Sequence, residues 1–232
     1  MNVVILHGQN HQGCTYHLAH HLLGNLNLPD VTLKEFYFSN QAGCLGCNQC
    51  FYKGEVHCPH AKIVQPIVTA IDAADLVILA SPCYCMGMTG SLKNFLDHLA
   101  YLWMAHRPHS EMFHKVGIVL STAGGAGAGK VTKALSEHLL FWGIPRIYSY
   151  PLIVNAASWE SISPKIHKKM TRQTNQLSHR IIRSLKHPRP TIKVRLIYKL
   201  MQKNQEHNVW NPLDKTLWDE LGLLIHSNPW HK

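Results

Sequence analysis

The chain has 232 residues, of which 46% are hydrophobic and 16% are charged, so it can bury a substantial core in one large domain or in two. Its net charge of +10 arises in the last third: residues 161–232 hold fourteen basic and four acidic side chains, whereas residues 1–160 hold nine of each. No stretch has the character of a secretory signal or of a membrane-spanning helix, so we expect a cytoplasmic protein with reduced thiols.

Five short apolar runs predict buried strands, at residues 3–7, 31–37, 76–81, 116–121 and 147–154. They are continuous rather than alternating, which is typical of strands covered on both faces of a parallel sheet. Helical patterns lie between most of them, at residues 15–23, 63–73, 92–103 and 131–142. This order predicts a doubly wound α/β domain, whose ligands bind beyond the carboxyl ends of its strands.

Three of the predicted strand ends run into loops suited to a phosphorylated, flat ligand. Residues 7–15 combine glycines, small polar side chains and a helix start, which favours phosphate, although a plain turn capped by Thr15 explains the same residues. Residues 81–91 add Tyr84 and Met86, which suit the edge of a heteroaromatic ring. Residues 124–130 fit the first seven positions of a P-loop, but Val131 replaces the hydroxyl that holds magnesium. A glycine loop lying against a flat cofactor is the simpler interpretation.

A cysteine-rich segment follows the second strand, and we expect it at the same sheet edge. It holds four of the seven cysteines of the chain: Cys44, Cys47, Cys50 and Cys58. The odd total and the reducing compartment argue against a disulfide framework. The spacing suits a 4Fe–4S cluster, whereas zinc usually takes two separated pairs. A cluster, a zinc site with help from His57 or His60, and a metal-free turn all stay open.

The motifs CLGCNQC at residues 44–50 with Cys58, and SPCY at residues 81–84 with LKNFLD at residues 92–97, resemble one known family. Over residues 2–155 the chain resembles the flavodoxin-like NAD(P)H-dependent FMN reductases, in particular their iron–sulfur flavoprotein branch. The resemblance implies a flavodoxin-like, doubly wound, five-stranded parallel sheet with helices on both faces. A basic C-terminal helical extension would follow it.

The resemblance also implies an FMN site made by the three loops. The phosphate would be held by Gly8, Asn10, Gly13, Cys14 and Thr15. The flavin ring would be lined by Pro82, Cys83, Tyr84, Met86 and Gly87, with Thr122, Ala123, Gly124 and Gly125 on its other side. The 4Fe–4S ligands would be Cys44, Cys47, Cys50 and Cys58. The family's usual serine and arginine are missing from the first loop, so we expect the FMN phosphate to be held there weakly, mostly by backbone amides and Thr15.

The function implied is transfer of hydride from NAD(P)H to bound FMN, and then of electrons to a quinone-like or other small acceptor. The cofactor carries this chemistry, so we name no catalytic side chain. One alternative is a flavodoxin-like electron carrier without NAD(P)H turnover. Another is a protein that binds nucleic acid, another polyanion or an anionic membrane through its basic tail.

The C-terminal third predicts a helix at residues 165–185, a break at the two prolines of residues 187–190, and a second amphipathic helix. We divide the chain into an FMN-binding domain, residues 1–186, and a basic extension, residues 187–232. We expect the extension to serve packing or subunit contact in a homodimer or tetramer.

Overall fold

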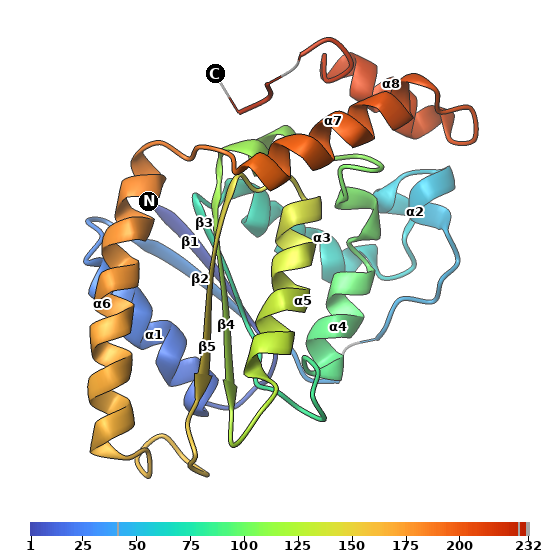
Figure 1. Ribbon diagram of the computed structural model, residues 1–232. Helices are drawn as coiled ribbons and strands as arrows, with labels where there is room; N and C mark the ends of the chain where they lie inside the picture. The colour runs from blue at the N-terminus through green and yellow to red at the C-terminus, as the bar shows by residue number, and fades with distance from the viewer. Residues whose placement is uncertain (41, 227, 231–232) are drawn as a thin grey trace.

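The computed structural model describes residues 1–40, 42–226 and 228–230. Its centre is a five-stranded sheet in the order β2-β1-β3-β4-β5, and all four neighbouring pairs are parallel (Figure 1). The strands are β1 (Asn2–His7), β2 (Thr32–Tyr37), β3 (Leu76–Ala80), β4 (Val116–Ala123) and β5 (Arg146–Ile153). The chain thus has the flavodoxin-like fold that the sequence predicts.

Helices cover both faces of this sheet because β1, β3 and β4 are apolar on both sides. One face packs against α1 (Cys14–Leu26) and α6 (Pro164–Lys186), through buried residues such as Leu22 and Ile181. The other face packs against α3 (Ala61–Ala73), α4 (Gly90–Asp97) and α5 (Ala128–Phe141). Figure 1 shows the two layers on either side of the sheet.

One predicted helix is wrong in its bounds. The helix expected at residues 92–103 begins earlier, after its N-cap Thr89, and ends at Asp97. A separate 3-10 turn, η2 (Ala100–Leu102), follows it. Leu99 and Leu102 continue the apolar spacing and are fully buried, but a 3-10 turn repeats every three residues and buries them without a continuous helix.

The last part of the chain forms α7 (Ile192–Glu206) and α8 (Pro212–Glu220). Both lie across the amino end of the sheet, away from the carboxyl ends of the strands (Figure 1). The Thr191 amide donates to the Pro145 carbonyl, just before β5 begins. A third apolar cluster joins this segment to the α/β layers, with Tyr198 and Trp218 packed near Phe113. Among the described residues, no helix is both long and apolar enough to cross a lipid bilayer.

Candidate cofactor site at the carboxyl edge of the sheet

Three loops meet where β1, β3 and β4 end, and direct hydrogen bonds join them. The Gly8 amide donates to the Ala80 carbonyl at 2.7 Å, which ties the first loop to the end of β3. The Cys83 amide donates to the Thr122 carbonyl at 2.8 Å. The hydroxyls of Thr15 and Thr122 are bonded at 2.7 Å in a buried position. The residues predicted from three distant parts of the sequence therefore lie at one edge.

The start of α1 leaves backbone N–H groups available at this edge. Its N-cap is Gly13, which has extended backbone and no side chain to cap the first turn. The helix has no acidic residue in that turn, and burial raises the pKa of the Cys14 thiol, which keeps it uncharged. Unpartnered amides at the positive end of a helix dipole attract an anion. Asn10 is exposed beside them.

Gly8 is required here by a close approach of neighbouring side chains. A Cβ atom at this position would lie 2.6 Å from the Thr89 hydroxyl and 3.0 Å from that of Ser81. Such contacts are far inside van der Waals distance, so a larger residue would push the first loop away from the β3–α4 loop. The glycine therefore holds the two loops together.

The β3–α4 loop presents an aromatic ring and a thioether on a tight turn. Tyr84 and Gly87 exchange two backbone hydrogen bonds of 2.9 Å, and the residues between them, Cys85 and Met86, both have left-handed backbone (φ 49° and 64°). Residues other than glycine, asparagine and aspartate rarely adopt this backbone conformation, so the turn is strained, as turns at functional sites often are. Tyr84 and Met86 are about half exposed, whereas Pro82 is buried beneath them.

The glycine loop after β4 has an open part and a packed part. Gly124 and Gly125 are exposed, and a Cβ atom on either would meet nothing within 4 Å. Gly127, which the sequence did not single out, has φ +95°, and its Cβ would lie 2.4 Å from the Cys83 sulfur. Thr122 and Ala123 are buried. They support the edge, whereas the two exposed glycines leave room for a flat ligand.

A histidine–carboxylate cluster beneath the first loop was also missed. The buried His7 and the half-buried His20 each place Nε2 2.8 Å from the same Glu35 oxygen, and Tyr37 stacks on His7 at 4.6 Å. Burial lowers the pKa of His7. Burial alone would raise the pKa of Glu35, but the His7 hydrogen bond and the charge of His20 hold it below its usual value. The available signal was the alternation of β2, which puts Glu35 on the same face of the strand as Leu33 and Tyr37.

The cysteine-rich segment, residues 42–60, leaves the cofactor edge instead of staying there. Gly43 lies beside Asn94 of α4, and the short helix α2 (Gln49–Tyr52) then lies next to α8 (Figure 1). Arg107 donates to the Cys50 carbonyl, and Asn211 to that of Phe51. These contacts explain why Cys50 does not stand at the expected sheet edge.

All seven cysteines are free thiols, and the four of this segment differ in exposure. Cys44 and Cys47 are exposed, whereas Cys50 and Cys58 are half-buried. Burial raises the pKa of Cys50, against the lowering effect of Arg107, and nearby Cys44 and Cys58 raise it further. Cys44 and Cys58 are therefore both near Cys50. The four do not form a compact single-ion site among the described residues.

Comparison with known proteins places this architecture in a family. A sequence model of the NADPH-dependent FMN reductases matches residues 1–158, which include every strand and all three loops of the edge. The chain belongs to the NADPH-dependent FMN reductase family. The match ends before α6, so the family model leaves the C-terminal helices unassigned.

Individual relatives of this FMN reductase family member match over shorter stretches. An iron-sulfur flavoprotein from Archaeoglobus fulgidus is 34% identical over 104 residues, which is 44% of each chain. An NADPH azoreductase from Bacillus sp. strain OY1-2 is 36% identical over 93 residues, covering 40% of this chain and 47% of the relative. The chain thus spans about half the length of the curated relatives it matches.

A solved structure confirms the fold of the family member. An azoreductase from Bacillus anthracis superposes with a TM-score of 0.62 over 78% of this chain and 99% of its own, at 14% identity. At that identity the likeness concerns the fold alone.

Proposed function

We propose that this chain is an FMN-dependent NAD(P)H oxidoreductase that passes electrons to a quinone-like or other small-molecule acceptor. The observation that carries the proposal is the meeting of an uncapped helix N-terminus with an exposed tyrosine–methionine turn at one sheet edge. An anion site and a flat apolar platform on adjoining loops of one sheet edge fit a phosphorylated ring cofactor. Membership of the FMN reductase family supports the same cofactor.

The residues fit FMN in two parts. At the phosphate end, the first-turn amides of α1 and the Thr15 side chain would bind, with Gly8, Asn10, Gly13 and Cys14 forming the loop around the anion. Since no arginine or lysine lies in this loop, binding depends on amides and on the helix dipole. The Thr15–Thr122 hydrogen bond positions this helix start against β4.

At the ring end, Tyr84 and Met86 would cover one edge of the flavin, with Cys83 and Gly87 completing the turn on the buried Pro82. The exposed Gly124 and Gly125, on the buried Thr122 and Ala123, would allow close backbone approach from the other side. Bound FMN supplies hydride acceptance and onward electron transfer, so the residues bind and orient rather than exchange protons.

We further propose that Cys44, Cys47, Cys50 and Cys58 hold a 4Fe–4S cluster. The cysteine spacing, the proximity of Cys44 and Cys58 to Cys50, and a relative named iron-sulfur flavoprotein support this proposal. Cluster thiolates bind four different irons, so they stand farther apart than the ligands of a single ion. Free thiols persist in a reducing compartment, so the cysteines also support a cytoplasmic location.

The C-terminal helices support a proposal for assembly. Ile192, Leu196 and Leu200 lie one turn apart on α7 and are 78%, 63% and 54% exposed. We propose that residues 187–232 are an extension to the domain of residues 1–186, and that this apolar stripe contacts a second copy in a homodimer or tetramer. The flanking basic residues keep an anionic surface as the alternative partner of the same stripe.

The test of the main proposal is an absorption spectrum of anaerobically purified protein, followed by FMN titration and NADPH addition. We expect flavin bands that bleach with NADPH and return when a quinone is added. Bands that appear with FMN but do not bleach would instead indicate the electron carrier. A protein that takes up no FMN at any concentration tested would contradict both.

A further inference from the structure

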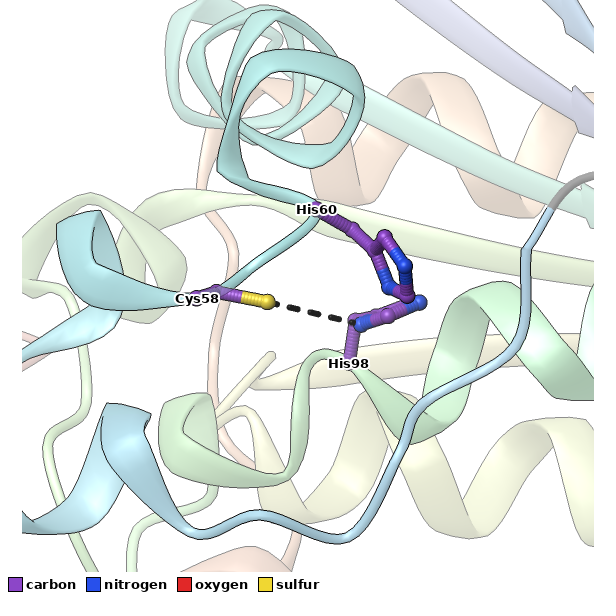
Figure 2. A group of neighbouring side chains, drawn as sticks. All are labelled: Cys58, His60 and His98. Carbon is purple, nitrogen blue, oxygen red and sulfur yellow. Dashed lines mark hydrogen bonds between the residues drawn. The ribbon is translucent and has the colours of Figure 1, made fainter.

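A compact group of three potential metal ligands lies apart from the cofactor edge. One ligand atom each of Cys58, His60 and His98 lies within 4.8 Å of the other two (Figure 2). The three come from the ends of different elements: Cys58 follows the 3-10 turn η1 (Glu55–His57), His60 precedes α3, and His98 follows α4. We propose that they bind one divalent transition-metal ion with the preference of zinc.

The tautomer of His98 prepares it as a ligand. Its Nε2 lies 3.1 Å from the Ala42 carbonyl, which can only accept a hydrogen bond, so Nε2 carries the proton. The lone pair of a neutral imidazole is then on Nδ1, which faces the Cys58 sulfur (Figure 2). Metal-binding histidines are commonly oriented by such a backbone carbonyl on the other ring nitrogen. His98 is only 6% exposed, so this orientation is fixed.

The distance between the ligand atoms matches a tetrahedral edge. The Cys58 sulfur and His98 Nδ1 are 3.8 Å apart. Zinc–sulfur and zinc–nitrogen bonds of about 2.3 and 2.0–2.1 Å, at a tetrahedral angle, place the two ligand atoms about 3.6 Å apart. An ion therefore fits between them with a shift of a few tenths of an ångström.

A simple hydrogen bond between the Cys58 thiol and His98 does not account for the environment of His60. Its ring stands edge-on to that of His98 at 5.1 Å, and its Nδ1 is buried without a hydrogen-bond partner. Leaving a buried nitrogen unsatisfied is costly, so it indicates a missing partner. An ion bound by His60 would supply this missing partner, and a water could complete its coordination.

A second histidine group shows what a satisfied cluster looks like. His7 and His20 both reach the Glu35 carboxylate at 2.8 Å, so the Nε2 atom of each is already paired. That group needs no ion. At Cys58, His60 and His98 the described residues provide three ligands and no fourth within the same distance.

The fourth position of the ion would face a small apolar cavity. This cavity has a volume of about 100 Å³ and is lined by both histidines and by apolar side chains that include Phe38, Ile67 and Phe95. It has room for a water or a small exogenous ligand. Three protein ligands with one open position are the arrangement of reactive rather than purely structural zinc.

The single-ion site and the proposed 4Fe–4S cluster both use the Cys58 thiolate, so one chain holds one or the other, and their remaining ligands separate them. A cluster needs Cys44, Cys47 and Cys50, whereas the single-ion site needs His60 and His98. It is also independent of FMN, which binds at the other loops. Its failure would leave the proposed reductase untouched, because FMN titration of the same samples reads that function separately.

The test is anaerobic titration of metal-free, reduced protein with Co²⁺, followed by displacement with Zn²⁺. We expect one Co²⁺ per chain, with a thiolate-to-cobalt band and the visible bands of a tetrahedral site. Cys58→Ser should remove the thiolate band, and His60→Gln should weaken affinity at least about tenfold. The exposed neighbour variant His57→Gln and the triple variant Cys44→Ser/Cys47→Ser/Cys50→Ser should bind as the wild type does.

Three results would overturn the proposal: no binding by the wild type, a thiolate band that survives in Cys58→Ser, or loss of the band in the triple variant. Since a change at a half-buried residue can disturb folding, the melting temperature is measured alongside. Zn²⁺ should raise it in the wild type and in His57→Gln but not in His60→Gln. Equal rises in all three would also count against the site.

Discussion

The two ends of the central sheet are built on different principles. At the carboxyl end, glycines, uncapped amides and half-exposed Tyr84 and Met86 leave groups without protein partners. At the amino end, α7 and α8 bury large side chains, and the fully buried Asp214 is paired with His106 and Arg107. The carboxyl end of the sheet therefore keeps polar groups available for a ligand, whereas the amino end uses its polar groups to stabilise the fold.

The largest expected effect lies at the amino end. Trp218 is fully buried and its indole N–H donates to the His106 carbonyl at 2.8 Å. Trp218→Ala should lower the free energy of unfolding by about 3–5 kcal/mol, measured by denaturant titration. FMN affinity of the folded fraction should not change. Trp210→Ala, at a 64% exposed position, is the control and should stay within about 0.5 kcal/mol.

The next effect tests the open end. Gly127→Ala places a side chain at φ +95° and 2.4 Å from the Cys83 sulfur, which should displace the turn carrying Met86. We expect a loss of about 1–2 kcal/mol in stability and at least about tenfold in FMN affinity, measured by fluorescence titration. Gly129→Ala, inside α5 with open space around it, should leave FMN affinity unchanged. Equal losses in both variants would remove the special role of Gly127.

An effect of similar size on stability, and a smaller one on FMN affinity, is expected at the hydrogen bond between the two loops. Thr122→Val leaves the buried Thr15 hydroxyl without its 2.7 Å partner, which should cost about 1–3 kcal/mol. FMN affinity should fall because the start of α1 is no longer fixed. Thr69→Val, whose hydroxyl only meets a carbonyl of its own helix in an exposed position, is the matched control.

The pH dependence of stability should come from the histidine–carboxylate cluster. The folded-state pKa of His7 is lowered by burial, so the unfolded chain binds its proton first, and stability declines as pH falls below the ordinary value of 6.5. The lowered pKa of Glu35 adds a loss at more acidic pH. His7→Gln should flatten the first part of the decline in denaturant titrations, whereas the exposed His11→Gln should not.

The smallest effect on stability is expected on the outer face of α7. Leu196→Glu should change the free energy of unfolding by less than about 0.5 kcal/mol, since the residue is 63% exposed. Its mass in solution, measured by light scattering, should fall to that of a monomer. A wild-type monomer would contradict the proposed contact. If Leu196→Glu and the wild type then bind anionic vesicles equally well, the lipid alternative for this stripe is also contradicted.

Much of the fold could be predicted because the strands are unusually apolar. The runs at β1, β3 and β4 follow directly from burial on both faces, and the three loops of the edge follow from parallel strands ending together. The sequence could not place Gly127, because the atom that crowds a side chain there is a sulfur forty-four residues earlier in the chain. The path of the cysteine-rich segment was missed for a similar reason, since Arg107 and Asn211 fix it from a distance.

The turn of Cys85 and Met86 has a consequence for engineering this chain. An Asn-Gly pair would relieve two left-handed residues and fits a turn of this geometry better than any other dipeptide. A search for thermostable variants would therefore select against Met86, which forms part of the proposed platform. A screen for heat resistance alone would return a more stable protein in which the proposed FMN site has lost its thioether.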